Sequence, residues 1–539
     1  MCEVISQNDV LELAFSSAKS YQDPFNEIQL KAIFIEPDGK EKVVSAFWSG
    51  DQVWKIRYSS AQRGQHPFRT VCSDINNEDL HGQEGRIEVS RYEGSNRLLE
   101  HGGLQSSANK SFLEHVDGTP FFWLADTWWM CLTKRLVWPD DFKLLTKDRV
   151  DKGFTVIQLV AGLFPDMDPL DDRGANEAGL VWNDDFSCIN PAYFDKVDEK
   201  IIWLVQSGLV PCIVGCWGYY LEHAGEEVIR KHWDYLLARY GAYPVIWCMA
   251  GEALMPFYKS EAFSDPEKKQ EYINQMRGQW TKLTRHVKQS DAFRRPITIH
   301  PTDFGHDMLD DSTLLDLDML QTGHSSYLSL EQTVKMIEQS VVREPRTPVI
   351  NSEACYEGLG GTSYQDIQRF LFWSCILSGA CGHTYGANGI WQVNSKEQPY
   401  GKSPTGVAWG NTSWEEAYQF PGSAQIGLGK RLLERYRWWE FSAHPEWIDQ
   451  HFAERSYLRP FVAGIPDHVR VIFSPFPAAW GGILVKGIEE NVNYRAYYYD
   501  PLNGDEYNLG KVIPNKAGNW RSGTATIVQD WVLVLEREK

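Results

Sequence analysis

Eight short, almost uninterrupted apolar segments follow one another between residues 120 and 392, with helical stretches between them. They are PFFWLADT (120–127), FTVIQLVAG (154–162), LVPCIVGCWG (209–218), YPVIWCMAGE (243–252), RPITIHP (295–301), DMLQTGH (318–324), TPVINSEACYE (347–357) and GACGHTYGANGIWQ (379–392). Strands buried on both faces have this character, and parallel strands need helical crossovers. Eight such units predict a (β/α)8 TIM barrel. An open doubly wound sheet would more often carry a glycine-rich loop where this chain has DTWWMCL.

The residues on either side of this region have the alternating pattern of antiparallel strands. QLKAIFIEP and QVWKIRYSS alternate near the N-terminus, and HVRVIFSPF, YRAYYYDPLNG and WVLVLERE follow near the C-terminus. Such runs, separated by turn residues, are typical of β-sandwiches. We therefore predict an N-terminal β-sandwich over 1–104, a catalytic barrel over 105–447 and a C-terminal β-sandwich over 448–539. Neither joint is a long Gly/Ser- or Pro-rich linker, so we expect both sandwiches to pack onto the barrel.

Charge and cysteine content limit the partners and the compartment. The chain has 539 residues, 53 Lys plus Arg and 72 Asp plus Glu, which gives a net charge of −19 and argues against nucleic-acid or anionic-membrane binding. No stretch approaches about 18 uninterrupted apolar residues. The ten cysteines form no CxxC or zinc-ligand pattern, and the beginning MCEVISQNDVLELAF lacks signal-peptide features. We expect a cytoplasmic protein with reduced thiols; the sequence neither predicts nor excludes a homo-oligomer.

Polar and aromatic side chains gather where the eight apolar segments end. In a (β/α)8 barrel the carboxyl ends of the strands carry the active site. Aromatic rings there could form the wall of a sugar-binding cleft, although each ring could equally pack in the core. The candidate substrate-binding residues are Asp126, Trp128, Gln158, Trp217, His300, His324, Tyr327, Tyr356, His383 and Trp391. The histidines are scattered singly, and no metal site or organic cofactor is predicted.

Two glutamates stand out among the strand-end residues. Glu252 ends the fourth apolar segment and Glu353 lies in the seventh, and neither segment contains another charge before it. Each alone could be a buried structural acceptor. Strands four and seven face one another across a barrel mouth, so the pair could flank one glycosidic bond. Carboxyl groups about 5–5.5 Å apart hydrolyse with retention, and groups about 6.5–9.5 Å apart with inversion.

The motifs DGTPFFWLADTWW, KGFTVIQ, GANGIWQ and NSEACYEG resemble the apiosidase-like catalytic domain over roughly residues 105–445. The resemblance implies a glycoside hydrolase with a clan-A-type barrel, in which Glu252 is the general acid/base and Glu353 the nucleophile. It also implies a preceding β-sandwich and a following collagen-binding-like β-domain. One departure concerns the residue before the acid/base, which is commonly Asn in clan A and is Gly251 here.

The leading hypothesis is a retaining, exo-acting glycoside hydrolase that cleaves short oligosaccharides or glycosides, with a furanoside or pentose-type sugar among the candidates. No cofactor is implied. One alternative is an inverting glycosidase or a polysaccharide lyase on the same barrel. Another is a non-catalytic carbohydrate-binding protein, prompted by the collagen-binding-like domain, and an intact carboxylate pair argues against it.

Overall fold

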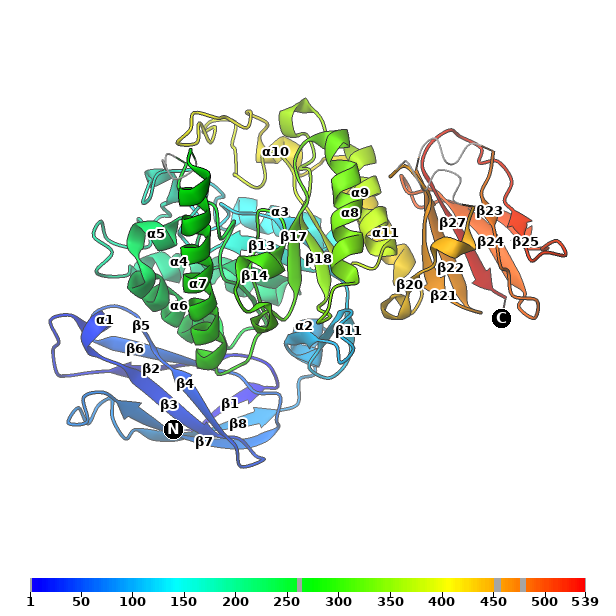
Figure 1. Ribbon diagram of the computed structural model, residues 1–539. Coiled ribbons are helices and arrows are strands. Elements are labelled where there is room, and N and C mark those ends of the chain that lie inside the picture. Colours follow the sequence, from blue (N-terminus) through cyan, green and yellow to red (C-terminus); the bar gives the residue numbers. More distant parts are fainter. Residues whose placement is uncertain (1, 259–263, 450–456, 476–480, 539) are drawn as a thin grey trace.

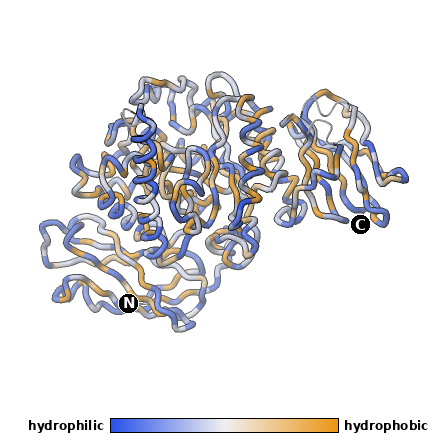
Figure 2. The backbone as a smooth tube through the Cα atoms, in the orientation of Figure 1, coloured by the Kyte–Doolittle hydropathy of each residue, from blue (hydrophilic) through white to orange (hydrophobic). Residues whose placement is uncertain are grey.

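The computed structural model describes residues 2–258, 264–449, 457–475 and 481–538. A central barrel lies between two β-sandwiches, with the N-terminal sandwich below it and the C-terminal sandwich at its side in Figure 1. Apolar residues concentrate in the strands of the barrel and of both sandwiches, whereas polar residues predominate in the loops (Figure 2). No helix in the described ranges is long and apolar enough to cross a lipid bilayer.

The barrel is built from eight parallel strands in the order β16-β15-β14-β13-β12-β19-β18-β17. They are β12 (Trp123–Thr127), β13 (Val156–Val160), β14 (Val210–Val214), β15 (Ile246–Cys248), β16 (Ile297–Thr298), β17 (Asp318–Gln321), β18 (Val349–Glu353) and β19 (Gly382–Tyr385). Each strand lies inside one of the eight apolar segments, so the predicted barrel is confirmed. The sheet closes between β16 and β17, where the Asp316 N–H donates to the Ile297 carbonyl at 2.8 Å.

Helices cover the outside of the barrel. They are α3 (Asp140–Asp151), α4 (Pro191–Gln206), α5 (Tyr220–Ala224), α6 (Glu226–Tyr240), α7 (Pro266–Ser290), α8 (Leu330–Val341), α9 (Gln365–Leu377), α10 (Trp414–Ala417) and α11 (Pro421–Leu433). Local sequence sets where they begin: Pro191 and Pro266 occupy first turns, and the Asn190 and Asp265 side chains accept from backbone N–H groups there. A proline loses no helical hydrogen bond at that position, and the cap satisfies a free donor.

The N-terminal sandwich pairs a five-stranded with a three-stranded sheet. The strands are β1 (Cys2–Ser6), β8 (Glu84–Ser90), β7 (Gly64–Cys72), β3 (Leu30–Ile35) and β4 (Glu41–Ser45), then β2 (Leu11–Ser16), β6 (Val53–Tyr58) and β5 (Phe47–Trp48), with α1 (Pro24–Glu27) between β2 and β3. Phe34 of one sheet stacks on Tyr58 of the other, with ring centroids 3.9 Å apart. The alternating N-terminal runs therefore bury one face of each sheet, as predicted.

A short segment joins this sandwich to the barrel. It contains α2 (Arg97–His101) and a three-stranded sheet of β9 (Leu104–Ser106), β10 (Leu113–His115) and β11 (Pro120–Phe121). The Asn96 side chain caps α2 and also donates to the Val205 carbonyl at 2.8 Å, just before α4 ends. The joint is thus fixed to the helical layer.

The C-terminal sandwich has a six-stranded and a two-stranded sheet. The strands are β20 (Ser442–Ala443), β21 (Phe461–Ile465), β22 (Val469–Ser474), β27 (Trp531–Arg537), β24 (Tyr494–Tyr499) and β25 (Glu506–Lys511), with β23 (Leu484–Val485) and β26 (Trp520–Arg521) in the second sheet. Trp447, Val485 and Trp531 belong to one buried cluster that spans both sheets. Strand β20 begins at Ser442, a little before residue 448, at which the sequence predicts that the C-terminal sandwich begins.

Buried ion pairs attach both sandwiches to the barrel. Arg57 of β6 bonds to Asp198 of α4, and its Nη1 donates to the Arg239 carbonyl at 2.9 Å. On the other side Arg369 of α9 makes two 2.7 Å bonds to Asp530, which lies just before β27. The expectation that the sandwiches pack onto the barrel is therefore confirmed.

Candidate active site

Glu252 and Glu353 meet at the carboxyl end of the barrel. The Gln321 Nε2 atom, at the end of β17, donates to Glu252 Oε1 and to Glu353 Oε1, each at 3.1 Å. Because one nitrogen atom contacts both oxygens, those oxygens are separated by no more than twice that distance. The two carboxyl groups predicted from the sequence thus share one amide.

The backbone brings the two glutamates to this point in different ways. Glu353 is the last residue of β18. Glu252 follows the end of β15, in a left-handed conformation with φ of 46°. The β14–β15 pairing resumes there, since the Gly251 N–H donates to the Cys216 carbonyl at 2.9 Å. A non-glycine residue at positive φ is strained, and such strain is concentrated at functional sites.

Gly251 is required by the ring beside it. A Cβ atom at this position would lie 2.2 Å from the ring of Trp217. The indole Nε1 of that tryptophan donates to Glu252 Oε2 at 3.2 Å. The glycine that departs from the clan-A pattern therefore makes room for an indole donor to the proposed acid.

Histidines surround Glu353. His324 Nε2 lies 2.8 Å from Oε1, and His300 Nε2 lies 3.0 Å from Oε2. Burial opposes ionisation of Glu353, but the hydrogen bonds and charges of the two histidines outweigh it and hold its pKa well below the usual range. Burial also opposes the charged form of His324, yet its bond to Glu353 raises the His324 pKa. Glu353 is therefore kept as a carboxylate.

Glu252 has the opposite electrostatic environment. Burial first, and then the charge of Glu353, raise its pKa to about 7, against the opposing effects of Gln321 and His300. Two neighbouring carboxyl groups with pKa values pushed apart are the usual arrangement of a proton donor and a nucleophile.

Aromatic rings form a wall beside the pair. The Trp129 Nε1 donates to the Tyr356 hydroxyl at 3.2 Å. The Tyr356 ring stacks on Trp391 with centroids 6.0 Å apart and lies 4.8 Å from the His324 ring. Trp129 also packs edge-on against Trp217 at 5.6 Å. Of the predicted substrate-binding residues, Trp217, His300, His324, Tyr356 and Trp391 are thus brought to the pair.

Asp126 and Trp128 are placed elsewhere. Asp126 is fully buried and accepts from Arg149 Nε of α3 at 2.6 Å and from the Trp128 Nε1 at 2.7 Å. Strand side chains alternate between faces, and Asp126 faces the helical layer. The sugar-binding role predicted for these two residues is therefore replaced by a structural one, because they join β12 to α3.

The structure pairs three more predicted residues, Gln158, Tyr327 and His383, with side chains or backbone groups other than the carboxyl groups of the two glutamates. Gln158 Nε2 crosses the barrel and donates to the Ser352 carbonyl at 3.0 Å. Tyr327 is 59% exposed and its hydroxyl bonds to Asp366 of α9. His383 is buried edge-on against Phe372 of α9, and burial lowers its pKa to about 3. The partners of Tyr327 and His383 thus lie on α9, whereas Gln158 bonds to the backbone of the residue directly before Glu353.

Four residues of the site escape the sequence analysis: Gln321, Asp166, Tyr258 and Trp409. Gln321 lies within the sixth apolar segment and ends β17, so the strand-end argument could have included it. Asp166 accepts from Tyr258 at 2.7 Å and from Trp409 at 3.1 Å, and all three lie in long connections where no periodic pattern marks them.

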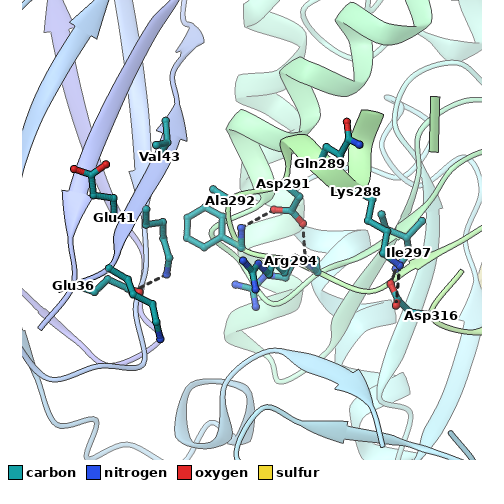
Figure 3. A pocket seen from close by; sticks show the side chains of 14 residues that line it. Glu36, Glu41, Val43, Lys288, Gln289, Asp291, Ala292, Arg294, Ile297 and Asp316 are labelled. Carbon is teal, nitrogen blue, oxygen red and sulfur yellow. Dashed lines mark hydrogen bonds and ion pairs between the residues drawn. The ribbon is translucent and has the colours of Figure 1, made fainter. Parts of the chain in front are cut away.

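A cavity in the described part of the chain lies away from this site. It measures about 920 Å³ and lies between the N-terminal sandwich and the barrel (Figure 3). Ile297 and Asp316 line it where β16 and β17 begin, at the opposite end of the barrel from the glutamates. Lining charges pair with one another, as Lys42 does with Glu36 at 2.8 Å. The cavity is therefore a gap in the interface between the N-terminal sandwich and the barrel. Its lining residues do not include Gln321, whose amide bonds to both Glu252 and Glu353.

Comparisons with known proteins agree with this description. Residues 107–440 match the family model of the apiosidase-like catalytic domain, and residues 5–73 match a domain of unknown function, DUF5060. No curated protein matches the sequence.

Similar solved structures cover most of the chain. A glycoside hydrolase family 5 protein from Bacteroides vulgatus is 22% identical, with a TM-score of 0.66 over 81% of this chain and 93% of its own. A second protein of that organism, provisionally described as a glycoside hydrolase, is 17% identical, with a TM-score of 0.69 over 99% of this chain and 100% of its own. A third structure, a glycoside hydrolase, is 22% identical, with a TM-score of 0.65 over 81% of this chain and 97% of its own. At these identities the likeness shows the fold.

Proposed function

The chain belongs to the apiosidase-like family of glycoside hydrolases, and from this premise we propose that it cleaves short oligosaccharides or simple glycosides with retention of configuration. One observation carries the proposal. A single amide, that of Gln321, bridges a carboxyl group with a raised pKa and a carboxylate with a lowered one.

In the first step the Glu353 carboxylate attacks the anomeric carbon while Glu252 protonates the leaving oxygen. The glycosidic bond breaks and a glycosyl ester forms on Glu353. In the second step Glu252 takes a proton from water, the water oxygen attacks the anomeric carbon, and the ester bond breaks to free Glu353. Two inversions give net retention.

The electrostatics support this exchange of roles. The negative charge of Glu353 is one cause of the raised pKa of Glu252. That charge disappears when the ester forms, so the pKa of Glu252 falls at the moment when the residue must act as a base.

The spacing of the pair supports retention over inversion. Twice the 3.1 Å contact to Gln321 is an upper bound for the two bridged oxygens, and it falls short of the separation of about 6.5–9.5 Å that an inverting water needs. Glu353 is only 6% exposed, which favours entry of a chain end over an internal segment and so favours exo action.

The substrate is proposed to be small and available in the cytoplasm. Nine cysteines in the described residues are free thiols and most are buried, as suits a reducing compartment. A panel of 4-nitrophenyl furanosides and pyranosides, pentosides included, would identify the sugar, and NMR of the first-formed product would give its anomeric configuration.

Two variants test the roles. Glu353→Ala should abolish turnover of every substrate, because no ester can form. Glu252→Ala should retain the first step on 4-nitrophenyl glycosides, whose leaving group needs little protonation. Added azide should then yield a glycosyl azide of retained configuration from Glu252→Ala and of inverted configuration from Glu353→Ala.

The opposite azide pattern would reverse the assignment. Full activity in either variant would make the pair structural. An inverted first product would establish the inverting alternative, and an ultraviolet-absorbing unsaturated sugar would reveal a lyase. Binding of sugars without turnover by the wild-type protein would leave only the carbohydrate-binding alternative.

A further inference from the structure

Asp166 is a third carboxyl group beside the pair, and the two-step reaction does not use it. It lies in the connection between β13 and α4. Its Oδ1 accepts from the Tyr258 hydroxyl at 2.7 Å, and its Oδ2 accepts from the Trp409 Nε1 at 3.1 Å. Tyr258 follows β15 and Trp409 follows β19, so one carboxyl group joins three loops at the mouth of the barrel. We refer to Asp166, Tyr258 and Trp409 as the Asp166 clasp.

The clasp is continuous with the aromatic wall of the active site. The Trp409 ring packs edge-on against Trp391 at 6.3 Å, and Trp391 stacks on Tyr356. Tyr356 adjoins Glu353, and the charge of Glu353 contributes to raising the Tyr356 pKa, after burial. The wall therefore leads from the group that would bond the sugar to the Asp166 clasp.

The charge of Asp166 is coupled to those of both glutamates. Burial raises the Asp166 pKa, and the charge of Glu353 adds to the effect. Asp166 in turn contributes to the raised pKa of Glu252.

The backbone at Asp166 is held in a demanding conformation. Its φ is 55°, in the left-handed region. The Asp166 N–H donates to the Tyr258 oxygen at 3.2 Å, and the Tyr400 hydroxyl donates to the Pro165 carbonyl at 2.8 Å. Neighbouring loops thus fix the direction of the Asp166 side chain, and strain of this kind is concentrated where a side chain binds a ligand.

Trp391, which belongs to the same wall, and its chain neighbour Gln392 have unpaired polar atoms in the described part of the chain. The Trp391 Nε1 and both amide atoms of Gln392 are buried and have no hydrogen-bond partner among the described residues. Buried polar groups are nearly always paired, so such atoms point to a ligand or water that completes them. A sugar hydroxyl next to Trp391 would do so.

We propose that the Asp166 clasp closes the cleft behind the terminal sugar and that Asp166 accepts a hydrogen bond from one hydroxyl of that sugar. This inference rests on the proposed function and deepens it. A carboxylate has about four acceptor positions, and among the described residues Tyr258 and Trp409 occupy two of them. Closure of the cleft by the clasp would exclude a further sugar, so the proposal implies that the enzyme requires an unsubstituted chain end.

The test measures kcat/KM for each of several variants on each of several substrates. The substrates are the 4-nitrophenyl glycoside that the wild type hydrolyses fastest, its monodeoxy analogues, and a version that carries a second sugar on the terminal ring. The variants are Asp166→Asn, Tyr258→Phe and Trp409→Ala. Asp172→Asn is the matched control, because Asp172 belongs to the same connection and its side chain is 87% exposed.

One monodeoxy analogue should lose at least about tenfold in kcat/KM with the wild type and with Asp172→Asn, as expected for a lost bond to a charged group. Asp166→Asn should hydrolyse that analogue and the parent at similar, lowered rates, and Tyr258→Phe should keep the wild-type discrimination. Trp409→Ala should raise the rate on the extended substrate relative to the parent. The alkaline limb of the pH profile should move to lower pH in Asp166→Asn, because a charge near Glu252 is removed.

The inference would be overturned if Asp166→Asn lowered kcat/KM equally on every analogue and left the pH profile unchanged. It would also be overturned if the wild type cleaved the extended substrate as fast as the parent glycoside. Thermal unfolding of each variant separates these results from misfolding. Failure here leaves the proposed function intact, since that depends on the azide products of Glu252→Ala and Glu353→Ala.

Discussion

Glu252 and Glu353 both accept from the Gln321 amide, but one favours the protonated form and the other the ionised form. The pH dependence of kcat/KM should reflect this difference. Catalysis needs Glu252 protonated and Glu353 ionised. The pKa of Glu252 is about 7, so kcat/KM should fall tenfold per pH unit above that value. The pKa of Glu353 is lowered, so the acidic limb should lie below the ordinary glutamate value of about 4.3.

Initial rates across the pH range would check this profile. His324→Asn is the informative variant, because it removes a group that stabilises the Glu353 charge and should move the acidic limb upward. An alkaline limb near the ordinary glutamate value would contradict the assignment of Glu252 as the acid.

The same shifts predict opposite effects on stability. A carboxyl group with a raised folded-state pKa costs stability increasingly between its unfolded and folded values, from about pH 4.5 to about pH 7, and by a constant amount above. Glu252→Gln should therefore stabilise the protein at pH 8 by roughly 3 kcal/mol. Glu353 has a lowered pKa and contributes stability above its unfolded value that is lost as pH falls. Glu353→Gln should destabilise the protein at pH 8.

Chemical denaturation of the two variants at pH 8 and pH 5 measures both effects. The Glu252→Gln gain should shrink at pH 5. Destabilisation by both variants at pH 8 would show that packing, not charge, dominates at these positions.

At the scale of elements, the packing of Trp217 against the backbone that follows β15 requires a glycine at position 251. Gly251→Ala would place a methyl group against the Trp217 ring and displace the indole that donates to Glu252. We expect kcat/KM to fall by about tenfold or more and stability by about 1–3 kcal/mol. Gly278→Ala in α7 is the control: its new Cβ would meet only Asp310 Oδ2, at 3.6 Å, and alanine favours the helix. Unchanged kinetics in Gly251→Ala would mean that Trp217 does not position the acid.

The eight strands were predictable because a strand buried on both faces must be apolar throughout, whatever its neighbours. The glutamate pair was predictable for a related reason, since a lone carboxyl group at the end of such a strand is costly to bury and stands out against the apolar run. Asp126 was misassigned because one residue of register decides whether a side chain faces the mouth or the helices. Asp166 and Trp409 were missed because the conformation of two loops brings them together, and loop residues follow no periodic sequence pattern.

At the scale of the molecule, a buried ion pair helps to join the C-terminal sandwich to the barrel. Among the described residues, Asp530→Ala would leave the Arg369 guanidinium, 5% exposed, with Gln425 as its remaining side-chain partner. Losing one partner of a buried pair costs about 3–5 kcal/mol. We expect a lower unfolding midpoint and faster proteolysis between barrel and sandwich. Arg437→Ala, which breaks the exposed pair with Glu440, should change either measurement little. Equal behaviour of the two variants would contradict this role of Arg369.

The closure between β16 and β17 has a consequence for motion. Among the described strands these two neighbours lack a continuous backbone ladder; the Asp316 carboxylate accepts from the Ile297 N–H at 3.0 Å, and Thr298 Oγ1 donates to the Leu317 carbonyl at 2.9 Å. His300 and Gln321, which hold the two glutamates, stand on opposite sides of this seam. A barrel joined at one place by a few isolated hydrogen bonds can widen there at little enthalpic cost, so the distance between the acid and the nucleophile depends on this junction. Amide hydrogen exchange should be faster along this seam than in β13 or β14, and a bound sugar should slow it by acting as a clamp across the gap.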